Sequence, residues 1–202
     1  KDYFVTYAAY PGEIPILVGG EAAGPWTRDE DLWAASVTGD NVEGLVVDGQ
    51  AQPLARAPND GYYTLPEMAQ STEAFRFRPG ELRAWPDMKH NRIVMLLRWH
   101  TGVNSITRID EVQQMAHLRR PQKGILVVPP RYYVENVRAL LDAPGEWFFD
   151  RKTNRLSYLN RLQDPNSVRT IIPLLNRLIA VEGQPGKPVR NLRINGLELE
   201  AA

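Results

Sequence analysis

The stretch from 131 to 159, RYYVENVRALLDAPGEWFFDRKTNRLSYL, constrains the possible folds of this chain more than any other. Its first part has apolar residues close to helical spacing, which predicts one short amphipathic α-helix that packs against a core through Tyr133, Val134, Val137, Leu140 and Leu141. The sequence Ala143-Pro144-Gly145 ends this helix, because proline cannot continue it and glycine accepts the turn.

A β-hairpin is predicted directly after this break. Its two strands cover 146–150 and 155–159 and are joined by a short turn. Successive side chains of a strand point to opposite faces, so we expect Trp147 and Phe149 on one face and Phe148 on the other. The hairpin therefore contributes large aromatic side chains to the core of a β-rich domain.

Nearly all remaining segments read as strands separated by Gly and Pro turns. The segment 91–100 holds consecutive apolar residues from Ile93 to Leu97, which predicts a central strand buried on both faces. In 74–78, Phe and Arg alternate as in a half-buried strand. The expected fold class is mainly β, an antiparallel β-sandwich or barrel-like domain with one short α-helix. Further strands are expected over 3–10, 15–18, 32–37, 44–47, 52–57, 105–109, 112–118, 124–128, 168–172 and 178–182.

Charge and composition exclude several classes of protein. Lys and Arg number 24 and Asp and Glu number 24, so no overall field attracts nucleic acid or an anionic membrane. The chain has no cysteine, which excludes thiolate chemistry and disulfides but leaves the cellular compartment open. No apolar run reaches transmembrane length. We expect a fragment of a longer protein, because the chain starts abruptly ahead of a strand.

The two ends of the chain resemble each other and differ from the middle. Near the C-terminus, apolar residues alternate across an Asn-Gly corner, as in one rung of a parallel β-helix: they are Leu192, Ile194, Leu197 and Leu199. The predicted organisation is a partial rung over 1–28, an inserted antiparallel β-domain over 29–178, and a return to the β-helix over 179–202. We expect the two rungs to lie side by side with the termini near one another, since the insert leaves and re-enters at one place.

Several blocks, in this order, resemble right-handed parallel β-helix enzymes of glycoside hydrolase family 141. The block 7–20, YAAYPGEIPILVGG, is similar to the start of these proteins. The blocks FRFRPGELRAW at 75–85, YVEN at 133–136 and LDAPGEWFFDRKT at 141–153 look like their inserted domain, and 173–197 resembles the return to the β-helix. The match covers nearly the whole chain.

This resemblance implies an exported bacterial protein, extracellular or periplasmic, that acts on carbohydrate. Relatives hydrolyse fucosides or xylans of plant polysaccharides, and glycoside hydrolysis normally uses two carboxylates. In such enzymes those carboxylates lie on later rungs, beyond Ala202, so we expect no catalytic residue, metal or cofactor in this chain. The insert would then shape the substrate cleft. A different reading is a non-catalytic glycan-binding or interaction module with a β-sandwich core.

Two pairs of acidic residues are candidates for acid–base chemistry. Glu135 and Asp142 are seven residues apart, which would place them near one face of the predicted helix. Glu146 and Asp150 flank the strand of the hairpin. Solvated carboxylates for the first pair, and a role in turns and at strand ends for the second, explain these residues without catalysis.

The predicted sugar contacts are Trp99, His100, Asn104 and Arg108, which would stack on and hydrogen-bond a sugar at a strand end. Aromatic packing under a loop is the other interpretation of this group. The segment 98–105 departs from the run that the family pattern leads us to expect, so no ligand contact is carried over from relatives. Trp26 and Trp33 could likewise form a sugar platform, or cover the junction between scaffold and insert.

Other motifs point away from further functions. His90, His100 and His117 lack a metal-ligand spacing, and Gly19-Gly20 and Asp60-Gly61 are turns rather than phosphate-binding loops. Arg119-Arg120 and its neighbours are balanced by acids, which argues against nucleic-acid binding. Polysaccharide lyase activity would need a basic residue near a bound uronate, and the sequence shows no such cluster.

Overall fold

The computed structural model describes residues 3–39, 42–69, 71–126, 129–160 and 163–201, and within them the chain is mainly β, as predicted. Its helical elements are three 3-10 turns, η1 (Lys123–Leu126), η2 (Arg138–Leu140) and η3 (Pro165–Ser167). None of the described helices is long and apolar enough to cross a membrane. The strands are β1 (Val5–Ala8), β2 (Ile16–Val18), β3 (Gly20–Ala22), β4 (Thr27–Asp29), β5 (Leu32–Ser36), β6 (Val46–Val47), β7 (Gln50–Ala51), β8 (Arg56–Ala57), β9 (Tyr63–Thr64), β10 (Ala74–Arg76), β11 (Arg92–Leu96), β12 (Thr101–Asn104), β13 (Ile106–Asp110), β14 (Met115–Leu118), β15 (Arg131–Glu135), β16 (Trp147–Asp150), β17 (Arg155–Tyr158), β18 (Thr170–Pro173), β19 (Leu192–Asn195) and β20 (Glu198–Glu200).

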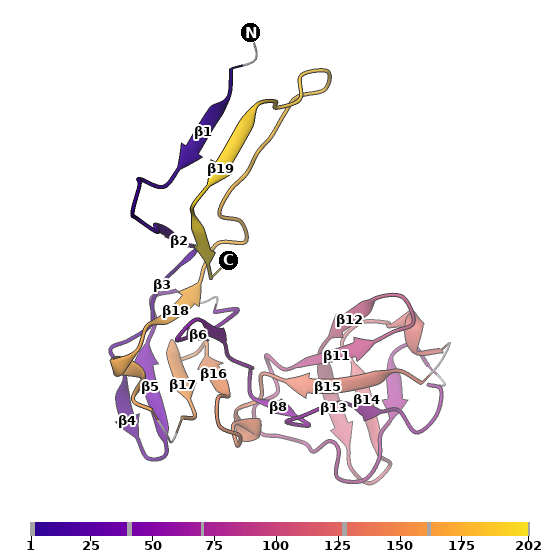
Figure 1. Cartoon of the computed structure of the whole chain (residues 1–202). Helices are drawn as coiled ribbons and strands as arrows, with labels where there is room; N and C mark the ends of the chain where they lie inside the picture. Colours follow the sequence, from indigo (N-terminus) through magenta and orange to yellow (C-terminus); the bar gives the residue numbers. More distant parts are fainter. Residues whose placement is uncertain (1–2, 40–41, 70, 127–128, 161–162, 202) are drawn as a thin grey trace.

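The two ends of the chain pair with each other through parallel strands. Strand β1 runs beside β19, and β2 runs beside β20 (Figure 1). This confirms that the ends lie side by side. The described ends of the chain do not meet, contrary to the prediction, because β1 begins beside Asn191 whereas β20 ends beside Gly19. We call β1, β2, β19 and β20 the terminal strands.

The chain leaves and re-enters the terminal region at one place. Strand β3 pairs antiparallel with β18, with Gly20 opposite Pro173. The Gly19 carbonyl accepts hydrogen bonds from the backbone N–H groups of Leu174 and Leu175, both at 2.8 Å. Gly20 is required here, since a Cβ at this position would lie 2.2 Å from the carbonyl oxygen of Ile172. The described residues between Gly20 and Pro173 form two lobes (Figure 1).

The proximal lobe lies next to the terminal strands and consists of two four-stranded sheets. Their strand orders are β16-β17-β5-β4 and β3-β18-β6-β7. Both sheets contribute side chains to one apolar core, so they pack against each other. The buried members of this core are Ala23, Trp26, Ala35, Val42, Leu45, Val47, Trp147, Phe149, Leu156, Tyr158 and Ile172.

The distal lobe holds a second core between two more sheets. One has the order β12-β11-β15-β8, with β9 also paired to β15, and the other has the order β10-β14-β13. The predicted central strand is confirmed as β11, whose Ile93, Val94 and Met95 are all buried. Phe75 and Phe77 point into the core while Arg76 and Arg78 are exposed, as the alternation predicted. The arrangement is sandwich-like, and the described strands form no closed barrel.

The α-helix expected over 131–141 is wrong. Residues 131–135 form β15, in which Tyr132 and Val134 are fully buried while Tyr133 and Glu135 face outward. Strand pairing on both sides, to β11 and to β8 and β9, stabilises the extended form over the weak helical pattern. Asn136 then takes a left-handed φ of 60°, which ends the strand before the single turn η2.

Two of the predicted strands were also wrong. The strand expected over 124–128 is instead the 3-10 turn η1 at its start, and residues 127–128 lie outside the described part of the chain. No strand forms over 178–182. The hairpin is confirmed, because β16 pairs antiparallel with β17 from Trp147 opposite Tyr158 to Asp150 opposite Arg155.

Candidate functional site

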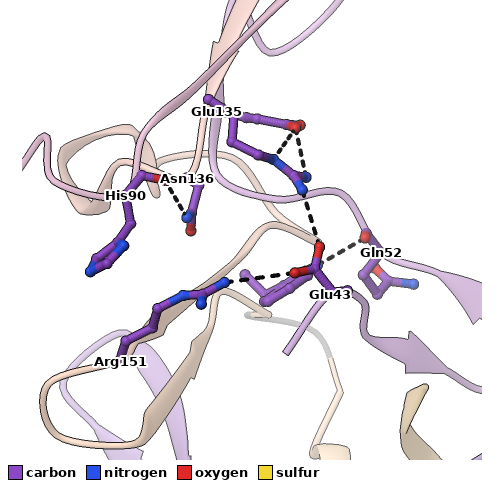
Figure 2. Close-up of polar contacts among 8 residues, drawn as sticks. Glu43, Gln52, His90, Glu135, Asn136 and Arg151 are labelled. Carbon is purple, nitrogen blue, oxygen red and sulfur yellow. Dashed lines mark hydrogen bonds and ion pairs between the residues drawn. The ribbon is translucent and has the colours of Figure 1, made fainter. Parts of the chain in front are cut away.

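The two lobes meet where the segment 53–56 runs beside the start of β16. The Ala55 backbone N–H donates to the Trp147 carbonyl at 2.8 Å, and the Trp147 N–H donates to the Pro53 carbonyl at 3.1 Å. The Trp147 indole N–H also donates to the Gln52 carbonyl, at 2.9 Å (Figure 2). These short bonds join the lobes through backbone and fix their relative position at this point.

Glu146 is a buried carboxylate at the same junction, with only 2% of its surface exposed. Its Oε1 accepts the Arg56 backbone N–H at 3.0 Å, and its Oε2 accepts those of Asp142 at 3.1 Å and Ala143 at 3.0 Å. Burial raises the pKa of the Glu146 carboxyl, while the three N–H bonds act in the opposite direction. Glu146 therefore ties the distal strand β8 to the loop before β16 and has a structural role.

A cleft of about 410 Å³ opens beside this junction, and we call it the inter-lobe cleft. The proximal side supplies Val42, Glu43, Leu54, Phe149 and Arg151. The distal side supplies Lys89, His90, Asn91, Arg92, Ser105, Arg119 and Asn136. Four of these side chains are cationic and one, Glu43, is a carboxylate, although the chain as a whole has no net charge. The cleft is therefore a locally positive site.

Glu43 bridges cations of both lobes at the centre of the cleft. Its Oε2 lies 3.2 Å from Arg92 Nη1 and its Oε1 lies 3.7 Å from Arg151 Nη2 (Figure 2). Arg92 also contacts Glu135 on the neighbouring strand, with 2.7 Å between Nη2 and Oε1. Glu43 is half exposed, so these ion pairs are in contact with solvent and each contributes little to stability.

The distal wall of the cleft is held by two asparagine side chains. Asn91 is buried, and its amide donates to the Ile106 carbonyl and accepts the Ile106 N–H, both at 2.8 Å. It also donates to the Met88 carbonyl. Asn136 Nδ2 donates to the His90 carbonyl at 2.7 Å (Figure 2). These bonds fix the loop that carries Lys89 and His90 at the cleft edge.

The structure distributes the predicted sugar contacts over different environments. Trp99 is 83% exposed at the tip of the β11–β12 hairpin, with the Arg98 guanidinium over its ring, and His100 is exposed beside it. Asn104 lies at the far end of β12, is buried, and bonds the Arg120 carbonyl and the Ser105 N–H. Arg108, on β13, contacts His117 at 3.0 Å. Trp99 and His100 thus lie beside each other on the surface, whereas the buried Asn104 side chain makes hydrogen bonds to the backbone.

The acidic candidates do not form a facing pair. Glu135 is bound to Arg92, and Asp142 accepts the Asn59 amide at 2.9 Å. Asp150 accepts the Lys152 N–H and the Thr153 hydroxyl, both at 2.9 Å, and so closes the hairpin turn. The contacts of Asp150 and Glu146 thus show that both residues stabilise turns and strand ends.

The tryptophan and histidine candidates are also explained by packing. Trp26 is buried in the proximal core and donates from its indole to the Thr170 hydroxyl at 3.1 Å. Trp33 is half-buried, donates to the Asn160 carbonyl at 3.0 Å and lies under the Arg28 guanidinium. Within the described ranges, no group of three or more His, Asp or Glu side chains is placed to hold a metal ion.

Sequence reasoning missed the inter-lobe cleft. Its cations are far apart in the sequence: Arg92 lies on β11, and Lys89, Arg119 and Arg151 lie in turns and bends of the two lobes. Basic residues that are scattered along the sequence therefore lie around one cleft in the folded chain. Locating it would have required knowing that β16 lies against 53–56, which no local pattern indicates.

Comparison with known proteins finds a similar solved structure. No family model matches the chain, and no curated protein does. A solved structure described as "Glycoside hydrolase" superimposes with a TM-score of 0.73 at 19% sequence identity. The alignment covers 98% of this chain and 42% of that one. The chain thus has a glycoside-hydrolase-like fold and spans less than half the length of that structure.

Proposed function

We propose that this chain is the substrate-shaping part of an exported β-helix glycoside hydrolase that acts on plant polysaccharide, fucoside or xylan. The observation that carries the proposal is the fold match along nearly the full chain to a protein described as a glycoside hydrolase, more than half of which lies outside the matched region. The catalytic carboxylate pair would belong to the part that is not matched. Among the residues that line the inter-lobe cleft, Glu43 is the one carboxylate.

The terminal strands support a β-helix as the scaffold. They pair in parallel, and an Asn195-Gly196 corner with a Gly196 φ of 73° separates β19 from β20. An apolar groove of about 490 Å³ lies between the two ends and includes Leu17, Ile194 and Leu197. Stacked rungs of a solenoid bury such a groove, because each rung covers its neighbour. We infer that further rungs would cover this one.

Activity assays test the proposal directly. The isolated chain should release no product from aryl fucosides or xylan, while a polypeptide that continues past Ala202 with further rungs should turn over one of them. Turnover by the isolated chain at a rate comparable with that of the longer protein would refute the placement of the catalytic pair. Glycan binding without hydrolysis by any longer form would instead favour the non-catalytic binding module.

A further inference from the structure

The inter-lobe cleft carries a surplus of positive charge that the fold does not use. Arg92 and Arg151 share Glu43 as a counter-ion across the lobes. The side chains of Lys89 and Arg119 make no hydrogen bond or ion pair with any other residue in the part of the chain that the structure describes. A stabilising salt-bridge network would pair these cations, whereas a binding site for an anion leaves donors available.

We propose that the inter-lobe cleft binds the carboxylate of a uronic acid residue in an acidic polysaccharide. This rests on the proposed function in taking the ligand to be a glycan, and it narrows the substrate class to glycans that carry negative charge. Guanidinium groups match carboxylates with two parallel N–H···O bonds, which gives geometry as well as charge. Arg119 on the distal side provides such a group, while Arg92, whose Nε and Nη2 contact Glu135, and Arg151 on the proximal side add positive charge.

Glu43 has a specific part in this site. Its carboxylate contacts Arg92 and Arg151, which are groups that a uronate carboxylate would contact. Because Glu43 is half exposed, ligand binding can displace it into solvent at small cost. Glu43 therefore competes with a bound anion for Arg92 and Arg151, and an anionic sugar displaces it when it binds.

The surface next to the cleft extends the site along β15. Glu135, which contacts Arg92, shares the outer face of this strand with Tyr133. Tyr133 and the exposed Tyr62 have ring centroids 6.0 Å apart, and the Arg56 guanidinium lies 4.0 Å from the Tyr133 centroid. Aromatic rings beside cations give neighbouring sugar units a surface for stacking and hydrogen bonding.

Calorimetric titration of the isolated chain tests this inference without any hydrolysis. The probes are a short oligogalacturonide and the same oligosaccharide after chemical reduction of its carboxyl groups. We expect binding of the uronate form, weakening as salt rises, and at least tenfold weaker binding of the reduced form. Equal affinity for both forms would overturn the proposal, as would preferential binding of a sulfated xylan oligosaccharide, which would assign the cleft to sulfate esters.

Two kinds of variant separate binding from folding. Lys89→Gln and Arg119→Gln should each weaken uronate binding about tenfold, the size of one charge-assisted hydrogen bond. Arg83→Gln, at an exposed arginine outside the cleft lining, should leave it unchanged. Glu43→Gln should strengthen binding several-fold, since it removes the competitor. A loss of affinity in Glu43→Gln would overturn the role given to this residue.

Binding and hydrolysis assays test the cleft proposal and the proposed hydrolase function separately. Uronate binding in a protein whose longer form hydrolyses no glycan would refute the proposed function and support the cleft. Hydrolysis of a neutral glycan by the longer form, together with no uronate binding by the chain, would do the reverse.

Discussion

Trp147 and Phe148 are consecutive residues of one strand, yet their side chains lie in different hydrophobic cores. Trp147 is 1% exposed in the proximal core, and Phe148 is 5% exposed in the distal core. Strand β16 therefore serves as a shared wall, with each face covered by one lobe. Such a strand links the stability of the two lobes, in addition to the hydrogen bonds at 53–56 and the ion pair between Glu43 and Arg92.

Truncation of these two aromatic residues should destabilise different lobes. We expect Trp147→Ala and Phe148→Ala each to cost about 3–5 kcal/mol, because each leaves a large cavity. Hydrogen exchange read by mass spectrometry should show lost protection first in β5 and β17 for Trp147→Ala and first in β11 and β15 for Phe148→Ala. Val112→Ala, at a residue that is 94% exposed, serves as the control. Identical exchange patterns in the two variants would contradict separate cores.

Glu146→Gln should destabilise the chain by about 1–3 kcal/mol at neutral pH. Both carboxylate oxygens accept backbone N–H groups, and the amide nitrogen of glutamine would face such donors instead. Urea denaturation measures the change. Glu30→Gln, at an exposed residue, is the matched control and should be neutral. A neutral effect of Glu146→Gln would show that its three hydrogen bonds are not important for stability.

The free energy of unfolding should depend on pH through Glu146. Burial raises the pKa of Glu146 in the folded chain, so between its ordinary value and the raised value the folded state holds a proton that the unfolded state has lost. The stabilising contribution of this proton is complete below about pH 4.3 and is lost as the pH rises through the raised pKa. The difference in unfolding free energy between wild type and Glu146→Gln should therefore change over this interval and be constant above it. A difference that is flat throughout would refute the raised pKa.

Gly20→Ala should disrupt the crossing between β3 and β18. The added Cβ would lie 2.2 Å from the Ile172 carbonyl oxygen, so backbone must shift, at a cost of about 1–3 kcal/mol. Gly102→Ala is the control, because the atoms nearest its Cβ, at 2.9 Å, belong to the flexible side chain of Gln122. Thermal unfolding followed by circular dichroism should show a clear fall in Tm for the first variant and a small one for the second. Equal shifts would mean that the crossing tolerates displacement.

Trp99→Ala tests the predicted sugar contact at the hairpin tip. Its side chain is almost fully exposed, so the change should alter stability by less than about 0.5 kcal/mol. If the ring stacks on sugar, the affinity for neutral oligosaccharides should fall while Tm stays constant. His100→Ala provides a comparison beside it. Unchanged affinity in titrations of both variants would remove the tip from the binding surface.

The hairpin and the central strand could be predicted because their signals are local. The alternation in Trp147-Phe148-Phe149 specified two buried faces, and the apolar run in β11 specified burial on both sides. The pairing of the two ends followed from the likeness of their patterns. These features depend on residues that are close in sequence or repeat one motif.

The rest depended on contacts between distant segments. Tyr133, Val134 and Val137 fit a helical stripe, but pairing to β11 and β8 favours a strand over 131–135, which its Tyr and Val residues also form well. The inter-lobe cleft arises only when Arg151 is carried to the distal lobe by the junction at Trp147. Neither outcome can be read from spacing along the chain.

The crossing at Gly20 and Pro173 has a consequence for how such a protein changes over time. Because the outgoing and returning segments are hydrogen-bonded neighbours, the distance that the insert must span is fixed and short. A tight turn of a few residues would span it as well as the two lobes do. Insertions, deletions or a complete exchange of the lobes thus leave the register of the terminal strands unchanged, and the lobes can vary in sequence independently of these strands.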